Sequence, residues 1–242
     1  MKAIFKNLLL TALPLAIAGL SHTASALTLT FDEDFVSHGT IINSQYRDLG
    51  VGVRAVNLSS GPNLAVAYDT TSRAANSISN RDPDLTGDWG NGNALIIQEN
   101  SDCNSLTCYR PDDEGSRPAG SIFFDFDTVI SGFSFDFIDI ERPELTGAEV
   151  RYLDSNASVV GSISFADLAG AVFGNNSYNS SEYIRLNGLG VTSLEFDLGG
   201  SGALDNISVS TVPLPASFSI FALGLAGLQL FRRRLQKTQS SK

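Results

Sequence analysis

Aspartates at regular spacing in one polar segment of this 242-residue chain match the ligand positions of a cation-binding loop. Asp82, Asp84 and Asp88 take the first, third and seventh positions of a loop like that of an EF-hand, with glycine at the sixth. Calcium and other hard cations take several carboxylate and carbonyl oxygens from irregular segments. The match stops at Asn93, which stands where an EF-hand has glutamate, and no helix is expected on either side. This segment is the first of two candidate calcium sites.

The second candidate calcium site joins the two ends of the predicted domain. Asp32 opens an acidic cluster that ends at Asp34, and Asp205 lies on the last predicted strand. In jelly-roll carbohydrate-binding modules the first and last strands often share a structural calcium ion, which favours this pairing. The alternative for both sites is that the acids face solvent and bind no metal. A structural calcium ion is the one cofactor that the sequence indicates.

Residues suited to catalysis are scarce. Apart from His22 near the N-terminus, His38 is the only histidine, and its Ser-His-Gly turn predicts a solvated loop residue and not a general base. The sequence has no Gly-x-Ser-x-Gly elbow, His-Glu-x-x-His helix or phosphate-binding loop. Abundant carboxylates leave a glycosidase-type acid and base pair open, although no two of them stand out. We therefore expect no enzyme, with a glycoside hydrolase or lyase as the least favoured alternative.

Two cysteines, Cys103 and Cys108, lie close together in the chain. Their proximity predicts a local disulfide, which by loop entropy contributes only about 2 kcal/mol and so pins a loop without holding the fold. Zinc is not expected, because His38 is the only histidine near the predicted domain and there is no second cysteine pair to complete four ligands.

Aromatic residues fall into two groups. Phe133, Phe135 and Phe137 recur at every second position, which predicts one buried strand face. Trp89 and Tyr109 lie near polar loops, where aromatic rings could stack on sugars. The second group motivates the alternative that the domain is a carbohydrate-binding module for extracellular polysaccharide.

Short apolar stretches separated by polar turns predict strands throughout residues 27–211. They are expected at 27–31, 51–56, 64–68, 93–99, 122–126, 130–140, 149–153, 159–165, 183–186, 191–196 and 204–209. We interpret 122–126 and 130–140 as a hairpin of core strands, and expect at most one helical turn before Gly50. With no amphipathic helix of normal length, the pattern predicts an all-β domain with an antiparallel, jelly-roll-like β-sandwich.

The N-terminus has the organisation of a secretory signal peptide. Lys2 and Lys6 precede an apolar segment at 8–20, and Ala24 and Ala26 supply the small-residue cleavage pattern. The sequence therefore predicts a signal peptide over residues 1–26, removed by signal peptidase, and a mature chain that begins at Leu27.

Charge is distributed unevenly along the chain. All 26 acidic residues lie in 27–211, with nine arginines and no lysine, whereas the remaining basic residues lie at the two ends. The domain alone carries a formal charge of about −17, against −10 for the whole chain. Such a surface disfavours nucleic acid and anionic lipid as partners and favours solubility and association with cations.

The C-terminal segment has three consecutive parts. The extended motif Val212, Pro213, Leu214 and Pro215 precedes an apolar run at 216–231, and Arg232, Arg233 and Arg234 follow. Sixteen helical residues span roughly 24 Å, short of a hydrocarbon core of about 30 Å, which suits a temporary anchor. The arginines would stay on the cytoplasmic side and leave the preceding domain outside.

This order of proline motif, short helix and arginine cluster over residues 212–237 resembles the PEP-CTERM sorting signal of exported bacterial proteins. The usual Val-Pro-Glu-Pro motif has leucine in place of glutamate here. The resemblance implies processing by an integral-membrane exosortase, transient anchoring by a C-terminal transmembrane helix, and export from a Gram-negative-type bacterium. Segments such as Phe31-Asp32 and Asp205-Asn206 are also similar to β-sandwich ectodomains that precede such tails.

These observations together predict a non-enzymatic protein of the cell surface or extracellular matrix. Its expected organisation is a signal peptide at 1–26, a β-sandwich ectodomain at 27–211 and a sorting signal at 212–237. Its expected partners are signal peptidase and exosortase during export, the membrane in transit, and extracellular polysaccharide in the carbohydrate-binding alternative.

Overall fold

The structure is a computed structural model that describes residues 25–71, Leu85, 92–113, 117–174 and 177–212. Several predicted features lie outside these residues: Ala24, the loop that carries Asp82, Asp84 and Asp88, Trp89, and the tail from Pro213, with Leu214, Pro215, Arg232, Arg233 and Arg234. Residues 24–212 form one compact unit.

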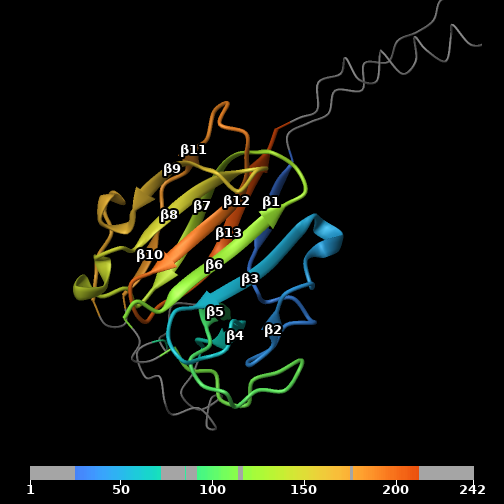
Figure 1. The fold of residues 1–242 in the computed structure, drawn as a ribbon, viewed down its shortest axis with the longest axis vertical. Helices are drawn as coiled ribbons and strands as arrows, with labels where there is room; N and C mark the ends of the chain where they lie inside the picture. The colour runs from blue at the N-terminus through green and yellow to red at the C-terminus, as the bar shows by residue number, and fades with distance from the viewer. Residues whose placement is uncertain (1–24, 72–84, 86–91, 114–116, 175–176, 213–242) are drawn as a thin grey trace, which may run out of the picture. The chain divides into compact units, whose positions relative to one another are not determined.

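The unit contains two antiparallel sheets packed face to face (Figure 1). The larger sheet contains β1 (Ala26–Leu29), β2 (Ile41–Ile42), β4 (Ala65–Asp69), β5 (Asn93–Ile97), β7 (Ile130–Ile138), β10 (Tyr178–Ser180), β11 (Ile184–Arg185) and β13 (Ala203–Thr211). Its order is β10-β7-β13-β5-β4-β2, with β1 paired to β13 and β11 paired to β7. The first and last described strands are therefore neighbours.

The smaller sheet has five strands in the order β3-β6-β12-β8-β9. These are β3 (Val51–Asn57), β6 (Gly120–Phe126), β8 (Glu149–Asp154), β9 (Val159–Ser164) and β12 (Val191–Leu198). The helical segments of the described residues are three single 3₁₀ turns, η1 (Arg47–Leu49), η2 (Arg142–Leu145) and η3 (Phe165–Asp167). The predicted all-β antiparallel sandwich is confirmed, as is the single turn before Gly50. Within the described residues no helix is long and apolar enough to span a membrane.

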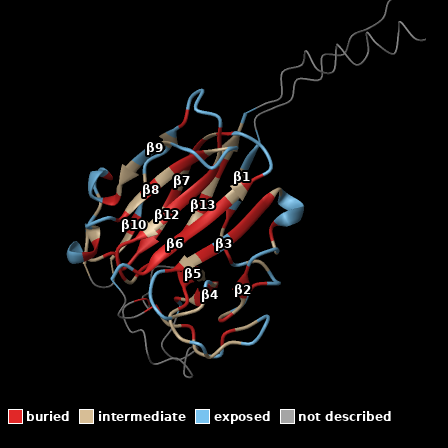
Figure 2. Cartoon of the chain, viewed as in Figure 1, coloured by how far each residue is buried: buried red, intermediate tan, exposed pale blue. Residues whose placement is uncertain are grey.

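The core lies between the two sheets, where the buried residues of the strands gather (Figure 2). It is rich in phenylalanine. Phe133, Phe135 and Phe137 of β7 are almost fully buried, as their period-two spacing predicted. The ring of Phe135 lies 4.9 Å from that of Phe196 on β12, centroid to centroid, in an edge-to-face arrangement. Aromatic contacts of this kind join the facing sheets directly.

The predicted hairpin of 122–126 and 130–140 is wrong. Strand β6 pairs with β3 and β12 in the smaller sheet, whereas β7 pairs with β13, β10 and β11 in the larger one. The segment 127–129 therefore crosses between the sheets. Both strands have apolar faces that point into the same core, and this pattern is satisfied equally well by strands that face each other across a sandwich.

Strands β2 and β10 were not predicted. They contain two and three residues, too few to show a periodic pattern, and each pairs at the margin of the larger sheet. Strand boundaries elsewhere agree with the expected ranges to within a few residues.

Candidate functional site

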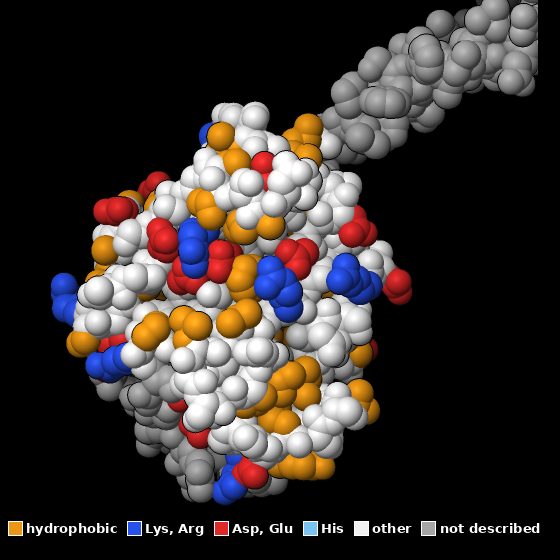
Figure 3. Space-filling model, viewed as in Figure 1, with side chains coloured by type: hydrophobic (Ala, Val, Ile, Leu, Met, Phe, Trp, Pro, Cys, Tyr) orange, Lys and Arg blue, Asp and Glu red, His pale blue; other side chains and the backbone are white. Residues whose placement is uncertain are grey.

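The outward face of the smaller sheet carries ordered rows of polar side chains. Successive strand residues point to opposite faces, so pairing aligns alternate residues across the sheet. One row contains Arg54 on β3, Phe123 on β6, Glu195 on β12 and Arg151 on β8. The next row contains Val56, Ser121, Asp197 and Glu149. Figure 3 shows the resulting band of acidic and basic side chains across this face, with hydrophobic side chains beside it.

A groove with a volume of about 610 Å³ lies over one end of these rows. Its floor comes from β6, β8 and β12, and its walls come from the segments that follow β3, precede β6 and connect η2 to β8. Its charged lining residues include Arg117, Arg151, Glu195 and Asp197, and its apolar ones include Leu58, Pro118 and Pro143. A concave site of this size with apolar walls and a few convergent polar groups is typical of small-ligand binding.

Arg151 is the centre of the polar floor. One of its terminal nitrogens, Nη2, lies 3.1 Å from Glu195 Oε1 and also contacts Asp197. Its Nε lies 3.7 Å from Glu149 Oε1 and has no hydrogen-bond partner among the described residues. The hydroxyl of Ser121 completes the network with a hydrogen bond to Asp197. The guanidinium therefore holds three carboxylates that alternate along two neighbouring strands.

Arg117 supplies the second cation of the groove. Its Nη2 lies 3.1 Å from Glu144 Oε1 and 3.3 Å from Glu141 Oε2. Glu144 is almost fully buried and also accepts hydrogen bonds from Ser201 Oγ and the Glu141 amide. The wall of the groove at η2 is thus attached to the domain by a buried carboxylate with several partners.

Arg54 lies at the end of the row and covers Phe123, which also lines the groove. The Arg54 guanidinium carbon lies 3.5 Å from the centre of the Phe123 ring, and Arg54 Nε lies 3.2 Å from Asp125 Oδ2. The cation covers one face of the ring, which is the expected cation–π arrangement. This face of Phe123 is therefore occupied by the protein itself.

The carboxylates of the floor are partly desolvated. Burial raises the pKa of Glu195, and the neighbouring Asp197 adds to the rise. Burial also raises the pKa of Asp197, against the opposing effects of Ser121 and Arg151. Both groups thus retain protons to a higher pH than a solvated carboxylate does.

The charge around the groove is negative despite its two arginines. Arg117 and Arg151 contact five carboxylates, which are Glu141, Glu144, Glu149, Glu195 and Asp197. Each charged group already has an opposite charge beside it. Among the described residues, the groove therefore offers hydrogen-bond donors and acceptors, and both of its guanidinium groups have carboxylates beside them.

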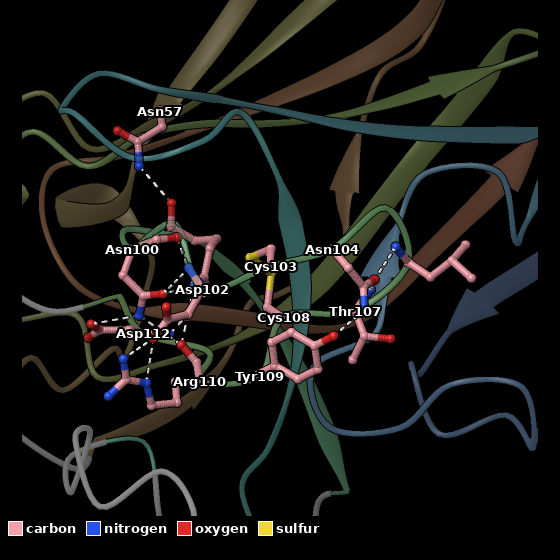
Figure 4. The surroundings of a disulfide bond; sticks show 12 residues. Asn57, Asn100, Asp102, Cys103, Asn104, Thr107, Cys108, Tyr109, Arg110 and Asp112 are labelled. Atoms are coloured by element: carbon pink, nitrogen blue, oxygen red, sulfur yellow. Dashed lines mark hydrogen bonds and ion pairs between the residues drawn. A yellow bond between two sulfur atoms is a disulfide. The ribbon is translucent and has the colours of Figure 1, made fainter.

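The predicted disulfide between Cys103 and Cys108 is present (Figure 4). The loop that it closes is held by its own polar residues: Asn104 Oδ1 accepts hydrogen bonds from the amides of Leu106 and Thr107 at 2.7 and 2.8 Å. Arg110 makes an ion pair with Asp102 at the base of the loop. The bond thus fixes a loop, as expected from the short separation of the two cysteines.

The disulfide loop also pairs with the segment that precedes β2. The Cys108 amide donates to the Gly39 carbonyl at 2.8 Å, and the Ile41 amide donates to the Leu106 carbonyl at 3.0 Å. Gly39 has a φ of 85°, and a side chain there would collide with the Cys108 carbonyl oxygen. Tyr109 is exposed beside this loop and does not line the groove.

The two ends of the domain bring Asp32 close to Asp205, as the second calcium hypothesis requires. Asp205 is buried, and burial raises its pKa to about 8, with smaller contributions from Asp32, Asp136 and Glu33. Asp205 accepts hydrogen bonds from the Asn206 amide at 2.6 Å and from Asn206 Nδ2 at 3.2 Å.

The oxygens of this acidic cluster have protein partners. Asp32 Oδ1 accepts from the amide of Asn93 at 2.6 Å, and Asp136 accepts from Asn206 Nδ2 at 2.8 Å. In the part of the chain that the structure describes, no three His, Cys, Asp or Glu residues form a group that could hold a metal ion. Asp32 therefore lies within the electrostatic environment of Asp205, and calcium binding by this pair stays a prediction.

His38 is not the solvated loop residue that its sequence context predicts. Its Nδ1 accepts a hydrogen bond from the Asp69 amide at 3.1 Å, and its ring contacts that of Tyr68 edge to face. Burial lowers the pKa of His38, which favours the neutral imidazole. The correction follows from pairing of the 38–41 segment with β4, which brings the ring over Tyr68. His38 has a structural role and lies away from the groove.

Comparison with known proteins identifies no family. The chain matches no protein-family model and no curated protein. Among solved structures it is similar to the K2 cleaved adhesin domain of Lys-gingipain, with a TM-score of 0.41 and 11% sequence identity. That match covers 76% of this chain and 99% of the adhesin domain.

The charged residues of the groove were not predicted from the sequence. Glu149 and Arg151 alternate on β8, and Glu195 and Asp197 alternate on β12, so each pair points to one face of its strand. This alternation is the local signal that could have identified an outward polar face on each strand. What the sequence did not show was that β8 and β12 are neighbours in a register that sets Arg151 opposite Glu195.

Proposed function

We propose that this chain is an exported, non-enzymatic protein of the cell surface or extracellular matrix whose ectodomain acts by binding a ligand in the groove. The observation that supports binding best is the groove itself, with a polar floor and apolar walls on a rigid sheet. Sites built on sheets hold their side chains more firmly than sites built on loops.

The arrangement of the carboxylates favours binding over glycoside hydrolysis. Hydrolysis needs one carboxyl group that protonates the leaving oxygen and another that acts as base or nucleophile. Glu195 and Asp197 instead share one nitrogen of Arg151, and Ser121 donates to Asp197. A pair fixed in this way is suited to positioning a ligand and not to exchanging protons with it.

Export and sorting are supported by the sequence at both ends and by the disulfide. Disulfides persist mainly in oxidising compartments outside the cytoplasm. We propose that signal peptidase removes residues 1–26 and that an exosortase processes the chain near Val212, the last described residue. In this proposal the C-terminal helix anchors the protein in the membrane of a Gram-negative-type bacterium until processing. The chain passes repeatedly between the two sheets, which supports the finer assignment of a jelly-roll-like sandwich.

Cell fractionation and intact-mass analysis in a strain with a working exosortase test this proposal. The expected result is a surface or matrix protein that begins near Leu27 and lacks Arg232, Arg233 and Arg234. The matched control is an exosortase deletion, in which the uncleaved C-terminus should remain with the membrane fraction. Mature surface protein that still carries the arginine cluster would refute processing.

Extracellular polysaccharide is the ligand class that the groove favours. Of the aromatic residues that first motivated this alternative, Tyr109 does not line the groove, and Trp89 lies outside the described residues. The support comes from the apolar walls beside a dense set of hydrogen-bonding groups. Binding of purified full-length chain to matrix polysaccharide, with no release of reducing sugar, is the expected outcome of a pull-down with a parallel activity screen.

A further inference from the structure

We propose that the groove selects a neutral, hydroxyl-rich glycan and rejects polyanionic glycans, an inference that rests on the proposed binding function of the same site. The groove lining places Arg151, Glu195 and Asp197 on the floor, with Leu58, Pro118 and Pro143 among its apolar residues. Three properties of the groove exclude other classes of ligand. These are the charges of its side chains, the partners that they already have, and the position of its strands in the sheet.

Polyanionic glycans are disfavoured by charge. The five carboxylates in contact with Arg117 and Arg151 outnumber the two guanidinium groups, and the whole predicted ectodomain has 26 acidic residues against nine arginines. A uronate or sulfate in the groove would lie close to Glu195 and Asp197. Repulsion between desolvated like charges is large enough to exclude a ligand.

Cationic ligands are disfavoured because the acids are already occupied. Arg151 Nη2 contacts both Glu195 and Asp197, and Ser121 also donates to Asp197. An ammonium group could bind them only by displacing a guanidinium that the sheet holds in place. Removing one partner of such a desolvated pair leaves an uncompensated charge, which is costly.

Peptides are disfavoured by the position of the groove in the sheet. Extended peptides commonly bind by adding a strand to a sheet edge, where backbone groups are free. The floor here lies on β6, β12 and β8, and each of these strands pairs with a neighbour on both sides. Their backbone groups are engaged within the sheet, so the floor offers no free strand edge to a peptide.

A neutral sugar suits both the polar floor and the apolar walls of the groove. Each hydroxyl group is both donor and acceptor, so it can donate to a carboxylate that Arg151 holds and accept from the Arg117 or Arg151 guanidinium. The side chains of Leu58, Pro118 and Pro143 offer apolar surface to the C–H face of a sugar ring. Leu58 is 61% exposed, so this surface is available to a ligand.

The test measures binding of the purified full-length chain, in mild detergent, to an array of four polymer classes. These are neutral glucans, mannans and galactans; uronate polymers; deacetylated amino-sugar polymers; and proline-rich peptides. The expected result is affinity for at least one neutral glycan that is tenfold or more above that for the other three classes. A preference for uronate, amino-sugar or peptide ligands would overturn the proposal.

Two matched variants assign any binding to the groove. Thr146 is an exposed residue of the groove lining, so Thr146→Trp should fill the groove and weaken neutral-glycan binding at least tenfold. Val172 is 68% exposed and does not line the groove, so Val172→Trp should leave binding unchanged. Equal binding by both variants would place the glycan site elsewhere and refute the proposal.

A third variant tests the charge argument directly. Glu195→Gln with Asp197→Asn keeps the shape of both side chains and removes their charges, which leaves Arg151 facing the groove with Glu149 as its remaining acid. Uronate binding should rise at least tenfold while neutral-glycan binding changes less. Unchanged exclusion of uronate by a folded double variant would contradict the electrostatic basis of selection.

Failure of this inference is separable from failure of the proposed function. If the array shows no binding at all, the ligand class is wrong, whereas surface location and C-terminal processing stand on fractionation and mass analysis. If a neutral glycan binds and is hydrolysed, the ligand class stands and the non-enzymatic function fails.

Discussion

Asp205 is a buried acid whose ionisation opposes folding of the described domain. It lies on β13 with 2% of its surface exposed, and burial raises its pKa to about 8. A carboxyl group whose pKa is higher in the folded than in the unfolded state stabilises the fold while it is protonated. That contribution falls as the pH rises from about 4, where the unfolded group titrates, to about 8.

We predict that Asp205→Asn makes the protein more stable than the wild type at high pH, since asparagine resembles the protonated acid in shape and stays neutral. The difference in free energy of unfolding should grow between about pH 4 and 8, and each unit of pKa shift corresponds to about 1.4 kcal/mol. Urea unfolding of the full-length chain at pH 5 and pH 8.5 measures it.

Asp48→Asn is the control, because Asp48 is exposed and should leave the stability difference near zero at both pH values. A loss of stability in Asp205→Asn at pH 8.5 would instead mean that the ionised carboxylate is needed. That outcome would favour a bound cation beside Asp32.

At the level of elements, β7 contributes three buried phenylalanines to the core. The Phe135 ring contacts those of Phe133, Phe137, Phe165 and Phe196, with centroid distances of 4.9 to 6.0 Å. We predict that Phe135→Ala lowers the free energy of unfolding by about 3 to 5 kcal/mol, through lost burial and the cavity left behind. Denaturant unfolding at neutral pH measures the loss.

Phe35→Ala provides the matched comparison for this core substitution. The same atoms are removed from a side chain that is 55% exposed, so the expected loss is well below that of Phe135→Ala. Similar losses from both substitutions would show that Phe135 isn't buried between the sheets.

We expect that opening the disulfide loop leaves the two sheets folded. Replacing both Cys103 and Cys108 by serine should lower the free energy of unfolding by about 2 kcal/mol, the entropy of closing so short a loop. Hydrogen exchange should become faster at the amides of Ile41 and Cys108, which bond across this loop, and stay slow in β7. A general loss of protection in β7 would contradict a merely local role.

The sequence predicted elements better than it predicted their neighbours. The period-two spacing of Phe133, Phe135 and Phe137 identified β7 and its buried face, because alternation depends on local geometry alone. Partners of a strand depend on segments far away in the chain. For that reason β6 and β7 were wrongly paired, and the contact between Arg151 and Glu195 was not foreseen.

The Asp32–Asp205 pair and His38 both depend on how distant strands pair, which the sequence indicates only in part. The pairing of Asp32 with Asp205 was proposed because the first and last strands of a sandwich are often neighbours. Strands β1 and β13 are neighbours here, and calcium binding by this pair stays a prediction. His38 was misjudged, since its burial depends on Tyr68 and on the pairing of β2 with β4. Local composition predicts a turn well, but it does not predict whether the residues of that turn are buried.

At the level of the whole molecule, the dominant feature is excess negative charge. The predicted ectodomain has 26 acidic residues and nine arginines, so repulsion among carboxylates opposes the compact state at low ionic strength. Both sodium and calcium screen this repulsion. Only an ion bound in the native state adds stabilisation by mass action, about 2.7 kcal/mol at 100 times its dissociation constant.

We therefore predict that calcium raises the thermal unfolding midpoint of the full-length chain above that in sodium chloride at matched ionic strength, with chelator as the baseline. The calcium-specific part of this rise is predicted to depend on Asp82, Asp84 and Asp88, which lie outside the described residues. Replacing these three aspartates by asparagine should remove the calcium-specific part of the rise and keep the part due to screening. If the loop variant keeps the full calcium effect, the ion binds near Asp32 and Asp205, and Asp205→Asn should then abolish it. Equal midpoints in calcium and sodium would mean that the acids at both sites act through solvation and charge alone.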